Sequence, residues 1–251
     1  HAVCVEQQSV INIGTETAGE IEISAIDGMG VRAKNGAIVS VGNENTKSVD
    51  IASGSSYGVL ALAQGAHVDI KGKNIKIATN ADEAGAIHAG NNNPADKVAT
   101  VNITGENIEI DAPTKDVYQG IGIGAMSWGI VNIEGNTTIR AQNAILARGD
   151  AQVNINKSGE NTVKMLGDIN FNYREEKSDS PVNATIDVNL VGEESFWKGN
   201  TVVSWDDVKP DPEKLVVSNA KITLKDGAVW NATKITDRET ATKGLRQIAL
   251  N

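Results

Sequence analysis

The chain is poor in the residues that several common protein classes need. One cysteine, Cys4, among 251 residues excludes an intramolecular disulfide framework and a cysteine-based zinc site. Only 23 Lys and Arg stand against 32 Asp and Glu, and the net charge of −9 disfavours nucleic acid and anionic membrane surfaces as partners. No apolar run approaches the roughly 18 residues that a membrane-spanning helix requires. We therefore expect no nucleic-acid partner and no membrane insertion by this segment.

Residues suited to catalysis are also scarce. The three histidines, His1, His67 and His88, do not neighbour a Ser or Cys in a nucleophile motif. Neither a glycine-rich phosphate loop nor a metal-spaced histidine pair occurs in the sequence. The densest carboxylate group, Asp206 to Glu213, lies in a proline-containing stretch and has two readings, a solvated linker or a weak calcium site. We expect a protein that is not an enzyme and has no cofactor and no bound metal.

What the sequence does contain is an internal repeat, in a chain with 25 Gly and 25 Asn. An apolar–polar–apolar tripeptide recurs with its third residue at positions 13, 41, 70, 103, 133, 155 and 188, so the steps are 28, 29, 33, 30, 22 and 33 residues. Periods of 20–50 residues are typical of solenoids and arrays. The seven copies are Ile11-Asn12-Ile13, Val39-Ser40-Val41, Val68-Asp69-Ile70, Val101-Asn102-Ile103, Val131-Asn132-Ile133, Val153-Asn154-Ile155 and Ile186-Asp187-Val188.

Each period holds two further alternating pieces. One series includes Val49-Asp50-Ile51 and Ile75-Lys76-Ile77, and the other ends in alanine, as in Val59-Leu60-Ala61 and Ile87-His88-Ala89. Period-2 patterns of β-branched residues indicate strands. Gly-containing tetrapeptides such as Lys71-Gly-Lys-Asn74 follow the first strand, where we expect tight turns with positive φ.

Three short strands in each period predict an all-β fold, a right-handed three-sided parallel β-helix. A propeller blade would need four strands in 40–45 residues, and a leucine-rich repeat would need more leucine. We expect regular coils over 1–167, and irregular loops and C-terminal capping coils of the same β-helix over 168–251. One coil cannot bury its own apolar face, so the inward side chains of successive coils should stack on one another. We expect stacks of Ile and Val inside two walls and a stack of Ala inside the third.

The C-terminal segment carries a resemblance to a known family. Lys221 to Thr233 contains Gly227, Ala228, Trp230 and Thr233 in the order strand, Gly-Ala-x-Trp-x-x-Thr. This segment resembles the C-terminal coils of bacterial autotransporter passenger domains of the pertactin-like surface-adhesin type. The resemblance implies export to the Gram-negative cell surface and roles in adhesion or aggregation. The remaining stretch, Glu239 to Asn251, is far too short for a translocator barrel.

Candidate binding residues fall into two groups. Arg148-Gly149-Asp150 is an integrin-type tripeptide, although Gly-Asp is also what a tight turn selects. Aromatic rings bind sugars or proteins but also pack terminal caps. The aromatic candidates are Phe196, Trp197 and Trp205 in the irregular region, and Tyr57 and Tyr118 at the ends of loops.

The outer faces of the predicted walls offer two further surfaces. The polar residues at the centres of the first series should form a ladder that is either self-bonded or offered to ligands. Wall three presents Arg32, Leu60, His88, Gly124 and Leu146 outward, so its apolar part is either a contact surface or covered by a long loop.

These observations favour a secreted or cell-surface adhesin-like passenger domain without catalytic activity. Its expected partners are a host-cell or extracellular-matrix protein or glycan, and self-association is a further possibility. A rigid rod displays many shallow contacts at once, so modest affinities combine. The alternative is a carbohydrate-active enzyme of the same fold, a polysaccharide lyase or glycoside hydrolase, which would require converging carboxylates on one wall.

Overall fold

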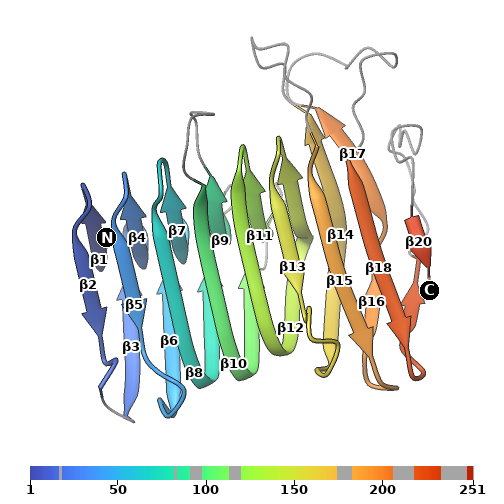
Figure 1. Cartoon of the computed structure of the whole chain (residues 1–251), viewed down its shortest axis with the longest axis horizontal. Coiled ribbons are helices and arrows are strands. Elements are labelled where there is room, and N and C mark those ends of the chain that lie inside the picture. Colours follow the sequence, from blue (N-terminus) through green and yellow to red (C-terminus); the bar gives the residue numbers. More distant parts are fainter. Residues whose placement is uncertain are drawn as a thin grey trace.

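The protein is a parallel β-solenoid in which three walls of strands surround an apolar interior (Figure 1). The computed structural model describes residues 1–16, 19–81, 84–90, 98–112, 120–173, 183–205, 218–232 and 248–250. Every strand pairing within these ranges is parallel, and the same ranges contain no helix. The all-β class, the parallel solenoid and the three walls are thus confirmed.

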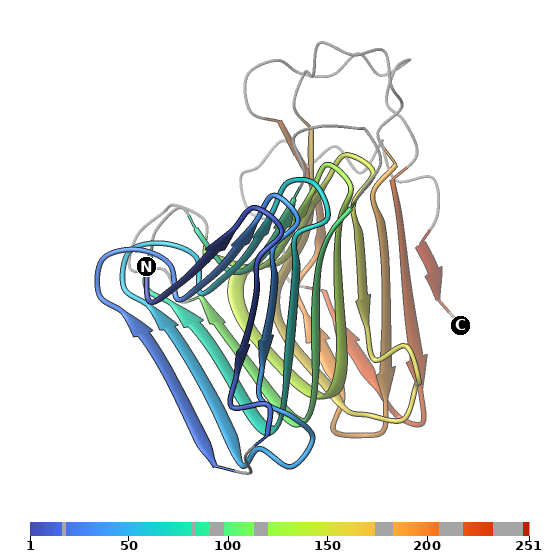
Figure 2. The ribbon, with the colours of Figure 1, turned by 60° about the vertical axis from the view of Figure 1, so that its left-hand side comes forward.

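Each wall is a continuous parallel sheet made of one strand from every coil (Figure 2). Wall one contains β2 (Val10–Ile13), β5 (Ile38–Val41), the first parts of β8 (His67–Thr79), β10 (Ala99–Ala112) and β12 (Gly129–Arg148), then β13 (Gln152–Ile155), β15 (Thr185–Val191), β18 (Asn219–Lys225) and β20 (Ile248–Leu250).

Walls two and three are built in the same way from the remaining strands. Wall two contains β3 (Glu20–Ala25), β6 (Ser48–Ser53), later parts of β8, β10 and β12, the first part of β14 (Val163–Tyr173), β16 (Phe196–Lys198) and β19 (Val229–Asn231). Wall three contains β1 (Val3–Glu6), β4 (Val31–Lys34), β7 (Val59–Leu62), β9 (Gly85–Gly90), β11 (Ile121–Met126), the ends of β12 and β14, and β17 (Thr201–Trp205).

The interior consists of side-chain stacks that run through successive coils. On wall one Ile70, Ile103 and Ile133 lie in register and are almost completely buried. On wall three the predicted alanine column is also confirmed, because Ala33, Ala61, Ala89, Ala125 and Ala147 are at most 1% exposed. The alternation of one polar residue between two β-branched residues therefore reports directly which side chains point inward.

The stack continues beyond residue 167 with different residue types. On wall two Ile139 is followed in register by Met165, then Trp197 and Trp230. The Trp197 and Trp230 rings stack with centroids 4.8 Å apart, and each indole Nε1 donates a hydrogen bond to a glycine carbonyl. Residues 163–173 and 183–205 thus form further coils of the same walls. The irregular loops predicted after Tyr173 and after Trp205 lie outside the described residues. The predicted strand Lys214 to Val217 lies outside the described residues.

The first corner differs from the predicted tight turn. Strands β8, β10 and β12 each run unbroken from wall one into wall two. Gly72 and Gly105 do not have positive φ, whereas Gly135 does, as predicted. Glycine is required there because the coils approach each other closely. A Cβ added to Gly105 would lie 2.7 Å from the carbonyl oxygen of Gly72, and one added to Gly135 would lie 2.0 Å from that of Gly105.

We predict that Gly135→Ala destabilises the protein by about 2 kcal/mol, because the added methyl group must push two coils apart and Gly135 has a φ of +140°. The matched control is Gly19→Ala, where a Cβ would meet no atom within 4 Å. Thermal unfolding measures both. Equal melting temperatures for the two variants would contradict the close approach of the coils.

No described segment forms a helix long and apolar enough to cross a membrane.

Candidate functional site

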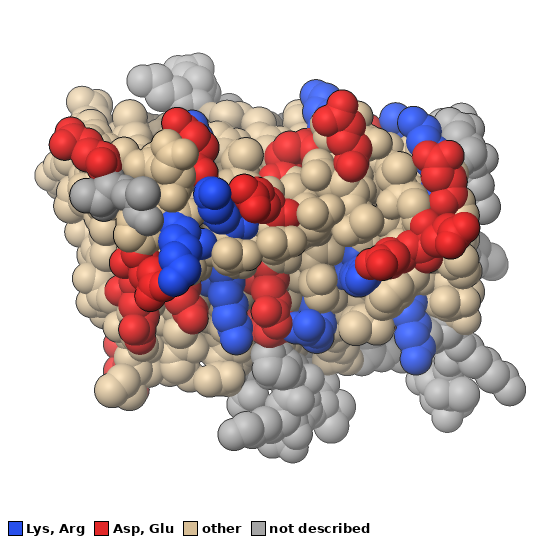
Figure 3. Space-filling model, turned by 90° about the horizontal axis from the view of Figure 1, so that it is seen from below, with Lys and Arg blue, Asp and Glu red and all other residues tan. Residues whose placement is uncertain are grey.

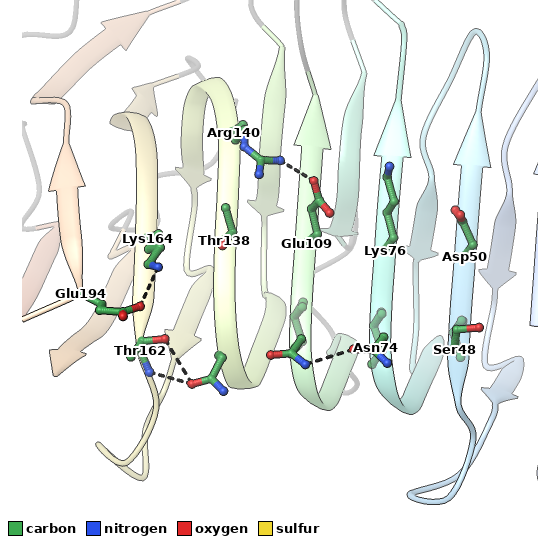
Figure 4. A pocket seen from close by; sticks show the side chains of 15 residues that line it. Ser48, Asp50, Asn74, Lys76, Glu109, Thr138, Arg140, Thr162, Lys164 and Glu194 are labelled. Carbon is green, nitrogen blue, oxygen red and sulfur yellow. Dashed lines mark hydrogen bonds and ion pairs between the residues drawn. The ribbon is translucent and has the colours of Figure 1, made fainter. Parts of the chain in front are cut away.

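A groove with a volume of about 620 Å³ lies on the outer face of wall two (Figure 4). It crosses strands β6, β8, β10, β12 and β14 and therefore runs along the solenoid axis. Its lining side chains come from successive coils because every second residue of each strand points outward. Among them are Asp50, Lys76, Glu109, Thr138 and Lys164, which follow one another in register.

An ion-pair cluster lies at one side of this groove. The guanidinium of Arg140 donates hydrogen bonds from Nη1 to Glu109 Oε1 and, at 2.9 Å, to Asp111 Oδ1. The bond from Arg140 lowers the pKa of Glu109, whereas burial raises the pKa of Asp111. The two carboxyl groups therefore respond differently to their surroundings although they share one cation.

The groove also contains a second ion pair and two separate charges. Lys164 Nζ donates to Glu194 Oε2 at 2.9 Å. Asp50 and Lys76 make no hydrogen bond or ion pair within the described part of the chain, and Figure 4 shows both side chains without a partner in the groove. Acidic and basic side chains are interspersed over the face of the molecule in Figure 3. An approaching ligand thus meets alternating charges.

A row of amides, Asn74, Asn107 and Asn136, follows the register of three coils in the lining of the groove, and Figure 4 shows Asn74 at its lower edge. Asn107 Nδ2 donates to Asn74 Oδ1 at 3.0 Å, and Asn136 Oδ1 accepts the backbone N–H of Thr162 at 3.0 Å. No hydrogen bond joins the side chains of Asn107 and Asn136, although the two residues are register partners directly after a register shift. The Asn107 oxygen and the Asn136 nitrogen, both on exposed residues, are therefore open to a ligand.

Wall one carries the predicted polar ladder, which is bonded to itself. Asn102, Asn132 and Asn154 each donate from Nδ2 to the residue one coil earlier, at 2.8–2.9 Å, and the first acceptor is Asp69. His67 Nε2 lies 2.8 Å from the other oxygen of Asp69. The self-bonded reading of this ladder is thus confirmed over these coils.

The ladder ends at Asp187, the register partner of Asn154, because a carboxylate cannot donate. Asp187 Oδ1 is buried without a hydrogen-bond partner in the described structure, and Oδ2 accepts from Lys221 at 3.3 Å. We predict that Asp187→Asn, which supplies a donor toward Asn154, raises the free energy of unfolding by about 1 kcal/mol. Denaturant unfolding measures the change, with Asp226→Asn in an exposed turn as control, and a loss of stability would contradict this extension of the ladder.

The outer side of wall three is buried where the sequence analysis leaves open an exposed apolar surface. Leu60, His88 and Leu146 are only 3%, 7% and 4% exposed, so they do not form a free contact surface. The Tyr57 ring packs against the His88 imidazole with centroids 4.9 Å apart. Burial and nearby Arg148 lower the pKa of His88 to about 4, and burial raises the pKa of Tyr57.

The structure places the charged ends of Arg148-Gly149-Asp150 on different partners. Arg148 is the last residue of β12, and its Nη1 lies 3.5 Å from Oδ1 of Asn172 in β14. Asp150 Oδ1 accepts the backbone N–H of Asn183 at 3.2 Å. Gly149 has a φ of +70°, as a tight turn requires. The tripeptide is half-buried, and it lies on wall three with Tyr57 rather than at the groove.

The aromatic candidates divide between the interior and the surface. Trp197 is completely buried, so its prediction as a contact residue is wrong, and packing of the stack accounts for it. Phe196 is half-buried and follows Lys164 in register on the outer face of wall two, next to the groove. Trp205 is the last residue of β17 in register with Tyr173, and Tyr118 lies outside the described residues, as do Asp206 to Glu213.

The groove is the feature that the sequence analysis missed. The outward positions of the second series, where charged residues alternate with Thr and Asn, indicated a polar face. That alternation does not show that the outer face of wall two is concave. No group of three or more His, Cys, Asp or Glu within the described ranges could hold a metal ion.

The fold and the groove define a parallel β-solenoid with a polar, ligand-accessible wall. Neither a scan against protein-family models nor searches of curated proteins and of solved structures found a match to this chain.

Proposed function

We propose that this protein is a non-catalytic binding protein of the adhesin type, which uses the wall-two groove to hold an extended surface ligand. The observation that carries the proposal is that polar side chains of successive coils line one continuous groove, in which Asp50 and Lys76 make no hydrogen bond or ion pair with the described residues. A long shallow groove collects many weak contacts, and repeated copies on a surface add their affinities.

Export to a bacterial cell surface and membership of the autotransporter passengers belong to the same proposal. They rest on the solenoid fold and on the segment around Gly227, Ala228 and Trp230, which forms the turn between β18 and β19 and the inward Trp230. A host-cell or matrix protein or glycan is the proposed partner class.

The experiment compares binding of the purified chain and of Thr138→Tyr to an array of glycans and matrix proteins. Thr138 points outward in the middle of the groove, so a tyrosine there obstructs any ligand. Thr100→Tyr makes the same substitution on the outer face of wall one, in β10, and serves as the control. We expect Thr138→Tyr alone to abolish binding. Equal binding by all three proteins, or no binding by any, would overturn the proposal.

A carbohydrate-active enzyme remains the second candidate, because Glu109 and Asp111 lie together at the groove with pKa values shifted in opposite directions. Glycoside hydrolysis uses a pair of carboxyl groups close to the scissile bond. Release of new reducing ends from host glycans or pectin, abolished by Glu109→Gln, would establish this activity and displace the binding function.

A further inference from the structure

The wall-two groove carries separate features for hydroxyl groups, for a negative charge and for a ring face. We infer that its ligand is a linear acidic glycan, a chain of sugar rings with carboxylates, lying along the solenoid axis. This inference rests on the proposed function and adds the ligand class.

The first feature is the break in the amide row. Between Asn107 and Asn136 one amide oxygen and one amide nitrogen stay without partners in the described structure. A sugar hydroxyl both donates and accepts, so it can bond to an acceptor and a donor placed on neighbouring coils. Coils are about 4.8 Å apart, roughly the length of one pyranose unit in a linear chain.

The second feature is the cation at Lys76. Arg140 is held by Glu109 and Asp111, and Lys164 by Glu194. Lys76 lies in register between Asp50 and Glu109 and its charge contributes to the lowered pKa of Glu109, but it forms no ion pair with either carboxylate. Lys76 lies two residues beyond Asn74 on the same strand, and in Figure 4 its ammonium group points away from Asn74, toward the opposite side of the groove. A ligand carboxylate on Lys76 forms a charge-assisted hydrogen bond there.

The third feature is the ring of Phe196, which follows Lys164 in the same outward column at the C-terminal end of the groove. Its half-exposed face is suited to stacking on the apolar face of a sugar ring. A peptide would gain less from this surface, because the strands of wall two are paired on both sides over the groove and have no free backbone edge to offer.

The test uses isothermal titration with three probes: a galacturonate hexasaccharide, the same hexasaccharide with its carboxylates methyl-esterified, and a hexaglutamate peptide. We expect the acidic sugar to bind about tenfold more tightly than the ester, as the loss of one charged hydrogen bond implies, and the peptide not to bind. Lys76→Gln should reduce the affinity for the acidic sugar to that for the ester and leave the ester unaffected. Lys221→Gln, on wall one, is the control with the same charge.

Each other result overturns the inference. Equal binding of acid and ester, or an unchanged affinity in Lys76→Gln, removes the carboxylate contact. Binding of hexaglutamate as tight as that of the sugar assigns the groove to an acidic peptide, and no binding of either sugar removes the glycan. The proposed function is judged separately by Thr138→Tyr on the array, so a protein ligand blocked by that variant would retain the function while the inference fails.

Discussion

Ile103→Asp is expected to abolish folding of the solenoid or to leave the chain insoluble. Ile103 is 1% exposed and stacks in register between Ile70 and Ile133. A carboxylate at this position would be surrounded by aliphatic side chains of three coils, without a cation or a hydrogen-bond donor. Burial of an unpaired charge typically costs more than about 4 kcal/mol, which is comparable to the whole stability of many domains.

The control for this variant is Thr104→Asp, which introduces the same charge at the next residue on the exposed outer side of β10. Circular dichroism and thermal unfolding of the soluble fraction distinguish the two variants. A soluble Ile103→Asp protein with the thermal midpoint of the wild type would show that the side chain does not point into the interior.

The second large effect is a loss of stability in acid that depends on His88. Its pKa is about 4 in the folded protein, because burial and Arg148 disfavour the imidazolium, compared with 6.5 for an unperturbed histidine. Between these values the unfolded chain binds a proton that the folded chain does not, so stability is complete above pH 6.5 and falls as the pH decreases toward 4. This lowering of the His88 pKa corresponds to a decrease of about 3 kcal/mol in the free energy of unfolding between pH 6.5 and pH 4.

Substitution of His88 by leucine tests this dependence. Leucine already occupies the equivalent positions Leu60 and Leu146 in the same outward column, so the wall accommodates it. The free energy of unfolding of His88→Leu should change by about 3 kcal/mol less between pH 7 and pH 4 than that of the wild type. His67→Leu, which alters a half-exposed histidine on wall one, should retain the His88 contribution. Identical pH profiles for the wild type and His88→Leu would contradict the buried neutral imidazole.

The glycines around His88 explain why the burial of its side chain could not be recognised from the sequence. A Cβ at Gly124 or Gly90 would lie 3.0 Å from one of the imidazole nitrogens, so glycines one coil later and two residues later leave room for the ring. In the sequence, both glycines only interrupt the Ile–Ala pattern and do not indicate a neighbouring ring. Only the register between β9 and β11 shows that they face the same side chain.

The walls could be predicted because inward residues of a parallel stack must repeat in both chemistry and spacing. Asn102, Asn132 and Asn154 occupy the same position of their repeats, and the structure joins them by hydrogen bonds. The repeat pattern gave no assignment for inward positions at which the residue type changes but the geometry does not. Met165 and Trp197 continue the isoleucine stack, although neither resembles isoleucine in a sequence pattern.

The groove could not be predicted for a different reason. The charges of wall two were visible, but the identity of the pairs depends on which rotamer each long side chain adopts. Arg140 reaches back to Glu109 and Asp111 on the preceding coil, and Lys164 turns to Glu194. Spacing along the chain specifies which residues are neighbours within a wall. Which of several oppositely charged neighbours a side chain pairs with depends on small differences between the free energies of exposed ion pairs.

The one-coil register has a consequence for how the chain reaches its native state. Val31 pairs with Val59 and Ile70 with Ile103, so each new strand finds its partner one repeat away, and the loop that must close is short and nearly constant in length. A folded coil also provides exposed strand edges with which the strands of the next coil can pair. This geometry favours folding that begins at any one coil and continues by the addition of neighbouring coils.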